Sequence, residues 1–122
     1  MPRGKPASTV RIPWYGQRSL TPRENVVSIT VIATLHATEE NRDELLAAVC
    51  RAVPGVLQED GCLQYAPHTV GKDRVVLVES WESPEALRAH GESPGMADFR
   101  AATAHLVTKP TEIVVARPVS VL

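Results

Sequence analysis

The stretch that decides the fold runs from Val75 to Phe99 and has the sequence VVLVESWESPEALRAHGESPGMADF. Its first part, Val75 to Trp81, is rich in apolar and β-branched residues and is predicted to form a strand. Ser83 is a suitable N-cap, and Pro84 follows it at a helical position where a missing N–H costs nothing. A helix should therefore begin at Pro84 and end at Gly91.

Glu79, Trp81 and His90 are predicted to lie near one another. Alternate side chains of a strand share one face, so Glu79 and Trp81 point the same way. In the following helix, Ala86, Leu87 and His90 have the spacing of the face that turns back toward the sheet. A carboxylate, an indole and an imidazole are therefore expected around one space.

The apolar pattern on either side of this stretch predicts further elements. The expected strands are residues 26–36, 62–70, 74–81 and 110–119, and the expected helices begin at Thr38, Pro84 and Pro94, the last running to Val107. Pro54 should kink the first helix rather than end it, because the apolar stripe resumes in phase beyond it. The order βαββαβ is that of a ferredoxin-like α+β sandwich, in which helices cover one face of an antiparallel sheet.

The face of such a sheet that the helices leave open must also be covered. A second copy of the chain is the economical cover, and apolar residues on both faces of the first, third and last strands fit this arrangement. We therefore expect a homodimer whose interface buries well over ~1,200 Å².

Charge is unevenly distributed along the 122 residues. Residues 1–25 contain four prolines and five basic residues against one acidic residue, a net charge of +4, which leaves −5 for the remainder. This composition predicts a basic, proline-containing arm over residues 1–25 and one folded domain over residues 26–122. Trp14 and Tyr15 in the arm either dock on the domain or a neighbouring subunit, or belong to an unstructured tail.

Several classes of partner and chemistry are not indicated by the sequence. An acidic domain does not favour nucleic acid, and no apolar run approaches the ~20 residues of a membrane span. Two cysteines without a second pair favour reduced thiols in a cytoplasmic protein. The four histidines have neither the spacing nor the cysteine partners of a zinc site, and no glycine-rich nucleotide loop follows a strand. The sequence therefore predicts no metal and no tightly bound cofactor.

Several short motifs follow one another in a characteristic order. They are Gly-Cys-Leu-Gln-Tyr at residues 61–65, Glu-x-Trp at residues 79–81, Ser-x-x-Ala-Leu at residues 83–87, a His nine residues after the Trp, and a Phe nine residues after that. This arrangement resembles the antibiotic biosynthesis monooxygenase (ABM) family, in particular its quinol monooxygenase-like members. The resemblance covers about residues 26–120 and leaves the arm unexplained.

The resemblance implies a dimeric α+β barrel, made by packing two sheets together, and oxidation of phenols, quinols or anthrones by dioxygen without a metal or flavin. Such chemistry is physically reasonable because a deprotonated polyphenol can itself donate an electron to oxygen. The protein then needs a dry pocket, a base and groups that hold the oxyanion. The expected function is a cofactor-independent monooxygenase acting on a quinol or polyphenol. The alternative is a non-catalytic dimer that binds a hydrophobic small molecule or serves as an accessory subunit.

The resemblance also implies a pocket between the sheet and the helices of each subunit. Its expected floor is Trp81, stacked on a planar substrate, and its expected walls are Leu87, Met96 and Phe99.

Three further side chains are candidates for the chemistry of this pocket. His90 is the first candidate for the base or the oxyanion donor; alternatively, it caps its helix or bonds Glu79 as a structural partner. Tyr65 either donates a hydrogen bond to a substrate oxygen or belongs to the edge of the core. His36, at the end of the first strand beside a loop, is a candidate substrate contact or a solvated side chain.

Two departures from the family pattern narrow the expectation. The haem-degrading branch carries an Asn in its first strand and an axial His on its later helix, whereas residues 28–36 contain no Asn and Thr103 occupies the axial position. The antibiotic-pathway members use an Asn four residues before the Trp, where this chain has Leu77. Haem degradation and the polyketide chemistry of that branch are therefore less favoured than quinol oxidation.

Overall fold

A computed structural model describes residues 28–120, so the predicted arm over residues 1–25, with Trp14 and Tyr15, lies outside the described residues. The elements are, in chain order, β1 (Ile29–His36), α2 (Arg42–Leu57), β2 (Cys62–Val70), β3 (Arg74–Trp81), α3 (Pro84–Gly91), α4 (Pro94–Thr103) and β4 (Glu112–Ala116). This order matches the predicted one, including the two separate helices that begin at Pro84 and Pro94. The division into an arm and a domain stays a prediction.

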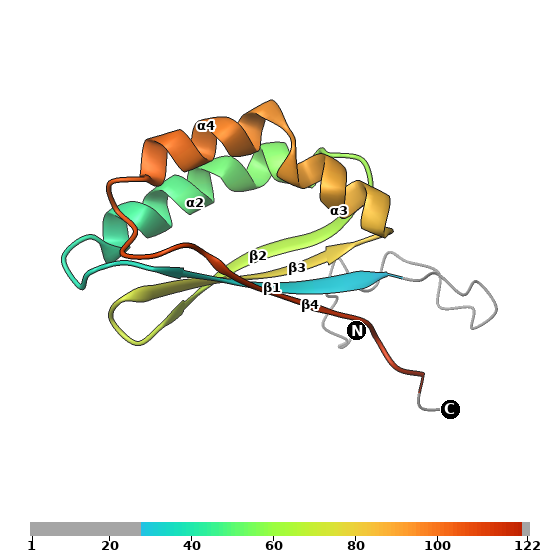
Figure 1. Cartoon of the computed structure of the whole chain (residues 1–122), viewed down its shortest axis with the longest axis horizontal. Coiled ribbons are helices and arrows are strands. Elements are labelled where there is room, and N and C mark those ends of the chain that lie inside the picture. The colour runs from blue at the N-terminus through green and yellow to red at the C-terminus, as the bar shows by residue number, and fades with distance from the viewer. Residues whose placement is uncertain (1–27, 121–122) are drawn as a thin grey trace, which may run out of the picture.

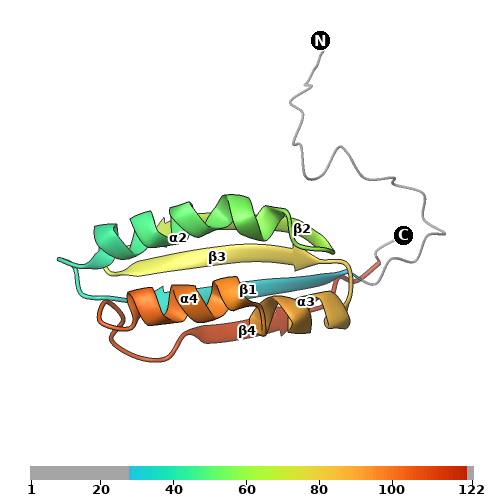
Figure 2. The ribbon, with the colours of Figure 1, turned by 90° about the horizontal axis from the view of Figure 1, so that it is seen from above.

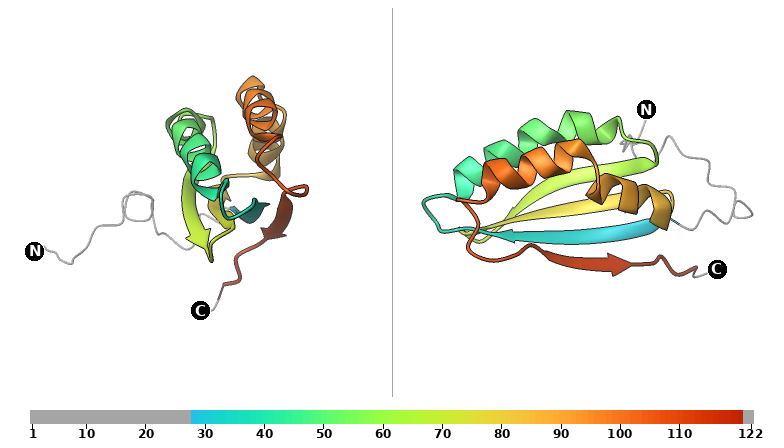
Figure 3. Two further views of the ribbon diagram at one scale, coloured as in Figure 1. Left: turned by 90° about the vertical axis from the view of Figure 1, so that its left-hand side faces the viewer. Right: turned by 45° about the horizontal axis from the view of Figure 1, so that its top comes forward.

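The four strands form one antiparallel sheet in the order β2-β3-β1-β4. The described helices all lie on one face of this sheet (Figure 1). An end-on view shows no described element over the opposite face (Figure 3). These features confirm the predicted α+β, ferredoxin-like fold.

The helices lie over the sheet in two rows (Figure 2). α2 covers the β2 side of the sheet, whereas α3 and α4 follow one another over the side formed by β1 and β4. The two rows therefore lie side by side above the same face of the sheet.

The core lies between the sheet and the helices. β1 and β3 pair so that Ile29 is opposite Trp81 and Val31 is opposite Glu79, and opposite residues in an antiparallel pair share a face. From α2, the buried residues Leu45, Val49 and Val56 pack against this face. Burying one such aliphatic side chain stabilises the fold by roughly 1.5–3 kcal/mol. Because β1 and β3 place their apolar side chains on the same face, burial of that face determines which side of the sheet packs against the helices.

The ends of α2 differ in part from the prediction. The helix begins at Arg42 rather than beside Thr38, because the Thr38 hydroxyl accepts the N–H of Asn41 and closes a turn before the helix. As predicted, the helix continues through Pro54 to Leu57.

The segment after α3 is also shorter than predicted. α4 ends at Thr103 rather than Val107, because the chain turns there and Val107 pairs with Ala37 in an isolated bridge beyond the end of β1. The last strand covers only Glu112–Ala116. The loop between them thereby borders the space under α4.

Candidate functional site

A cavity of about 480 Å³ lies between the sheet and the helices α3 and α4. This volume is within the range of roughly 300–1,000 Å³ that is typical of small-molecule sites. Its sheet side is formed mainly by Val31, Ala33, Leu35 and Leu77, and its helix side by Leu87, Met96 and Phe99. The apolar walls contrast with a polar group formed by Tyr65, Glu79 and His90, which also border the cavity.

The junction of α3 and α4 fixes the position of His90. The Ser83 side chain accepts the N–H of Ala86 and begins α3, as predicted, so that His90 falls in its last turn. The Ser93 hydroxyl donates to the His90 carbonyl at 2.8 Å, and its oxygen accepts the N–H of Met96 at 3.2 Å to begin α4. His90 is therefore held where the two helices meet.

Three side chains surround the imidazole of His90, which is buried. Its Nδ1 lies 2.9 Å from Oε1 of Glu59, in the turn between α2 and β2. The ring stacks on Trp81 with centroids 4.6 Å apart and an interplanar angle of 29°, and Tyr65 meets it edge-on at 5.4 Å. The imidazole thus has one nitrogen and one face occupied by protein.

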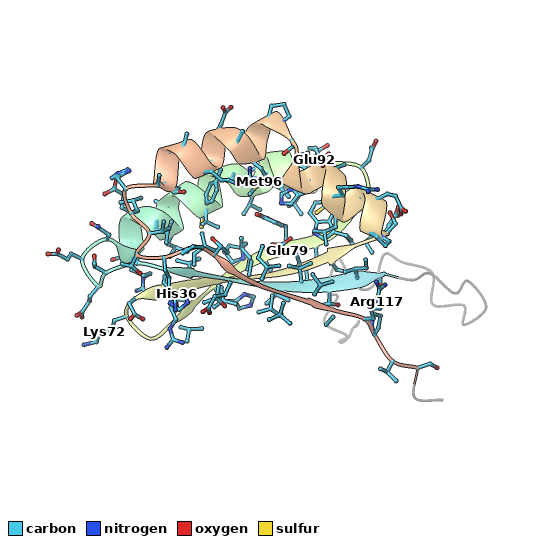
Figure 4. All side chains as sticks on the ribbon, in the orientation of Figure 1. His36, Lys72, Glu79, Glu92, Met96 and Arg117 are labelled. Atoms are coloured by element: carbon cyan, nitrogen blue, oxygen red, sulfur yellow. The ribbon has the colours of Figure 1, made fainter. Side chains whose placement is uncertain are left out.

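Glu79 is a buried carboxyl group beside this imidazole, in the space between the sheet and the helices (Figure 4). Trp81 Nε1 donates a hydrogen bond of 2.9 Å to its Oε1. Burial raises the pKa of Glu79, and the nearby Glu59 raises it further, against the opposing effects of the Trp81 hydrogen bond and the charge of His90. Glu79 therefore tends to keep its proton.

Two other acidic groups near the site are also held in their neutral forms. Burial, followed by the charges of Glu79 and Glu59, raises the pKa of Tyr65 well above its ordinary value, so the phenol remains a hydrogen-bond donor. Burial and Glu59 raise the pKa of Cys62 to about 11. A protonated thiol is a poor nucleophile, and Cys62 is a small, partly buried residue packed against the core.

This arrangement can bind an apolar ligand and exchange a proton with it. The walls exclude water from a planar ligand, while an imidazole, a carboxyl group and a phenol are available to a ligand oxygen at one place. Titratable groups with shifted pKa values in a cavity are typical of functional sites.

Most of the predicted site residues border this cavity. Tyr65, Leu87, His90, Met96 and Phe99 all line it, and the structure brings His90 and Tyr65 into contact.

Three predicted contacts differ from the structure. Trp81 is fully buried and does not line the cavity; it supports the ring of His90 instead of forming the floor. His36 lies outside the cavity (Figure 4), and its Nε2 is 3.0 Å from Oε1 of Glu112. The expected pair between Glu79 and His90 is also not formed as a hydrogen bond, because Glu79 bonds Trp81 and His90 bonds Glu59.

Sequence reasoning missed Glu59 and two basic residues. Glu59 directly precedes the Asp60-Gly61 turn signal, which marks the end of α2 but does not indicate where the preceding side chain points. Arg100 and Lys109 also line the cavity: Arg100 donates to the Gly91 carbonyl at 2.8 Å, and Lys109 pairs with Glu112 at 3.2 Å.

Within residues 28–120, no group of three or more His, Cys, Asp and Glu side chains is arranged to hold a metal ion. No helix in the same part of the chain is both long and apolar enough to cross a membrane.

Comparison with known proteins identifies relatives of the chain. It is 33% identical over 83 residues to the Escherichia coli (strain K12) protein named "Probable quinol monooxygenase YgiN", covering 58% of this chain and 80% of that protein. It is 30% identical over 91 residues to "Putative monooxygenase Rv0793" of Mycobacterium tuberculosis, covering 74% of this chain and 90% of that protein.

Solved structures have the same fold. The Rv0793 structure has a TM-score of 0.70 at 29% identity and covers 76% of this chain and 96% of its own. A protein from Deinococcus radiodurans, described as "a putative antibiotic biosynthesis monooxygenase", has a TM-score of 0.70 at 25% identity, covering 77% of this chain and 95% of its own.

The family model described as "Antibiotic biosynthesis monooxygenase" matches residues 28–102. This match extends over more than half of the chain and includes most of the cavity, from Val31 on β1 to Arg100 on α4. The chain therefore belongs to the antibiotic biosynthesis monooxygenase family.

Proposed function

We propose that the chain is a cofactor-independent monooxygenase that oxidises a quinol or polyphenol with dioxygen. The observation that carries this proposal is the cavity, whose apolar walls enclose Tyr65, Glu79 and His90 beneath α3 and α4. Membership of a monooxygenase family and the name of the Escherichia coli relative support the same class of reaction.

The proposed reaction needs no external reductant. A quinol and dioxygen together contain the atoms and electrons of a hydroxyquinone and water: one oxygen atom enters the ring, the other leaves as water, and the quinol supplies all four electrons. The step that the protein must assist is removal of the hydroxyl proton, because the resulting arenolate is electron-rich enough to react with oxygen directly.

The side chains of the cavity fit this step. His90 accepts the hydroxyl proton, while the phenol of Tyr65 donates a hydrogen bond to the developing oxyanion. Burial raises the pKa of Glu79, so its carboxyl group can donate a second hydrogen bond over the pH range in which it is protonated. Leu87, Met96 and Phe99 contact the ring of the substrate and keep water from the reactive arenolate.

We also propose that the active form is a homodimer, packed through the open face of the sheet. Ala66, Val78, Ile32 and Val114 form a row across all four strands on that face, because each is opposite the next in the strand register. Such a row of apolar side chains on a face without helices favours packing against a second sheet.

Oxygen uptake with reduced quinones tests the enzymatic proposal. We expect the full chain to consume oxygen faster than buffer, and ¹⁸O₂ to place one labelled atom in the product and one in water. His90→Gln should lower kcat by about 10²-fold or more, since a general base contributes roughly 10²–10⁴-fold. The matched control is His105→Gln, because His105 is an exposed histidine that does not line the cavity.

Two outcomes would contradict the proposal. Oxygen uptake no faster than in buffer with every reduced quinone would contradict the proposed reaction. Tight binding of the same quinones would then support the non-catalytic alternative. Equal rates in wild type, His90→Gln and His105→Gln would remove His90 from the chemistry.

A further inference from the structure

We propose that Glu59 is a positioning residue, which holds the proton of His90 on Nδ1 and so directs the bare Nε2 toward the ligand in the cavity. This inference rests on the proposed function in that the ligand is a hydroxyarene. Glu59 does not line the cavity itself, so besides the effect of its charge on the pKa values of Tyr65 and Glu79 it can act on the ligand only through His90.

The turn that carries Glu59 is held by the backbone on both sides. Its N–H donates to the Val56 carbonyl at 2.9 Å, and its carbonyl accepts the N–H of Cys62 at 3.2 Å. The 2.9 Å contact from its Oε1 to Nδ1 of His90 joins two side chains that are 26% and 6% exposed. A short hydrogen bond that is largely shielded from water, made from a fixed turn, is strong enough to select one form of the imidazole.

The other contacts of His90 leave one route into the cavity. The Nδ1 edge meets Glu59, and one face of the ring stacks on Trp81. Neither Glu59 nor Trp81 lines the cavity, whereas His90 does. With the Nδ1 edge and one face occupied, the Nε2 edge and the other face of the imidazole are the parts left to meet a ligand in the cavity, where Tyr65 also lies next to the ring.

The chemistry of the pair then fixes the tautomer. An ionised carboxylate can only accept a hydrogen bond, so the proton between Glu59 and His90 belongs to Nδ1. In the neutral imidazole the other nitrogen then carries a lone pair. The pair thus prepares Nε2 as a base without any movement of the ring.

The proton transfer balances in one step. The O–H bond of the ligand breaks, an N–H bond forms at Nε2, and the electron pair stays on the ligand oxygen. The imidazolium that results is stabilised by the Glu59 carboxylate on its far side. Tyr65 and Glu79 border the cavity, where the phenol, and the carboxyl group when it is protonated, can donate to the new oxyanion.

A purely structural clasp between the turn and α3 makes different predictions. If the hydrogen bond between Glu59 and His90 only stabilised the fold, removing it would lower the free energy of unfolding. It would not be expected to change the tautomer of His90, or to change kcat without KM. The tautomer and the division of the effect between kcat and KM therefore separate the two roles.

The test is Glu59→Gln in the full chain, labelled with ¹⁵N at histidine and studied by NMR at a pH that leaves the imidazole neutral. The Gln amide can donate to Nδ1 as well as accept from it, so it no longer selects one tautomer, and we expect the Nδ1–H form of wild-type His90 to be replaced in part or in full by the Nε2–H form. With a reduced quinone, kcat should fall by about 10²-fold while KM changes by less than about twofold. His90→Gln assigns the resonances.

Two further variants complete the design. Glu59→Asp retains the carboxylate and should keep the Nδ1–H form, which guards against a Gln variant that is merely unstable. Glu44→Gln is the matched control, because Glu44 is an exposed carboxylate 3.9 Å from the exposed His105 and outside the cavity. It should change neither the His90 resonances nor kcat.

The NMR measurement is independent of turnover, so the two proposals fail separately. A change of tautomer in Glu59→Gln with no oxygen uptake by the wild type would support the positioning role and count against the reaction alone. An Nε2–H form in the wild type, or a tautomer unchanged in Glu59→Gln, would overturn the role of Glu59.

Discussion

At the scale of single residues, Trp81 supports the site without entering it. The indole is fully buried, stacks under His90 and donates to Glu79. We expect Trp81→Ala to lower the free energy of unfolding by about 3–5 kcal/mol, as for other large buried side chains. Trp81→Phe keeps a ring under His90 but leaves the Glu79 carboxyl without its donor, and should cost about 1–3 kcal/mol.

Urea unfolding followed by far-UV circular dichroism measures both effects without relying on the indole signal. Equal stabilities of Trp81→Ala and wild type would contradict the structural role. Because Trp81→Ala is expected to unfold easily, loss of activity in that variant alone would say little about substrate binding, whereas Trp81→Phe is the informative variant.

Glu79 gives the stability of the protein a dependence on pH. Its pKa is raised above the ordinary value, chiefly by burial, so between those two pKa values the folded chain keeps a proton that the unfolded chain has released. Stability contributed by this group is therefore present at low pH and is lost as the pH rises through this window. Glu79→Gln cannot ionise, and its side-chain oxygen still accepts from Trp81.

We expect Glu79→Gln to gain stability relative to wild type as the pH is raised above about 4, the ordinary pKa of a glutamate. Urea unfolding at each pH gives the difference in free energy, in which the titration of the other groups largely cancels. Glu44→Gln, at an exposed carboxylate, should show no such trend. A difference for Glu79→Gln that stays constant with pH would mean that Glu79 ionises as easily in the folded chain as in the unfolded one.

At the scale of elements, Gly61 sets the distance between β2 and α3. Its φ is +83°, and an added Cβ would lie 2.6 Å from the Cβ of Ala86. Gly71, in the turn between β2 and β3, also has a positive φ of +61°, but an added Cβ there meets nothing closer than 3.5 Å. The two glycines therefore separate backbone strain from steric overlap.

We expect Gly71→Ala to cost about 1–2 kcal/mol of stability for the left-handed backbone alone. Gly61→Ala should have the same backbone cost and, in addition, about 1–3 kcal/mol for steric overlap, because α3 must move away from β2. In a double-mutant cycle, Ala86→Gly should recover part of the cost of Gly61→Ala. Equal costs for the two single variants would show that α3 yields to the added methyl group.

The elements were largely predictable from the sequence because period-two and helical patterns directly reflect burial. The strand from Arg74 to Trp81 has the predicted bounds, and Glu79 and Trp81 share the predicted face. α4 ends early because Val107 pairs with Ala37, a contact between distant residues that periodicity does not contain. Leu106 is nonetheless buried, as the apolar pattern indicates.

The candidate site was predictable only in part, for the same reason. Helical spacing placed His90 toward the sheet, but its hydrogen-bond partner Glu59 is 31 residues away on a turn with no repeating pattern. Period-two alternation predicted the sheet face on which Trp81 lies. It did not predict that His90 would cover the indole and separate it from the cavity, because this depends on how α3 packs above β3.

At the scale of the whole molecule, the two faces of the sheet differ in what covers them. The face beneath the helices contains the core and the cavity, whereas the other face has no described element over it (Figure 3). On that open face, Ile32 lies between Val78 and Val114 in the register of the three strands β3, β1 and β4. Ile32 is therefore near the centre of any dimer formed through this face.

Size-exclusion chromatography with light scattering tests whether the open face forms the proposed dimer. Ile32→Glu would place two unpaired carboxylates in a symmetric interface. We therefore expect the dissociation constant of the dimer to increase by on the order of 10²-fold or more. Leu57→Glu is the matched control, because Leu57 is also an apolar side chain, is 46% exposed and ends α2 on the helical side. A dimer that withstands Ile32→Glu but dissociates in Leu57→Glu would place the interface on the helices, and the open face would then need another cover.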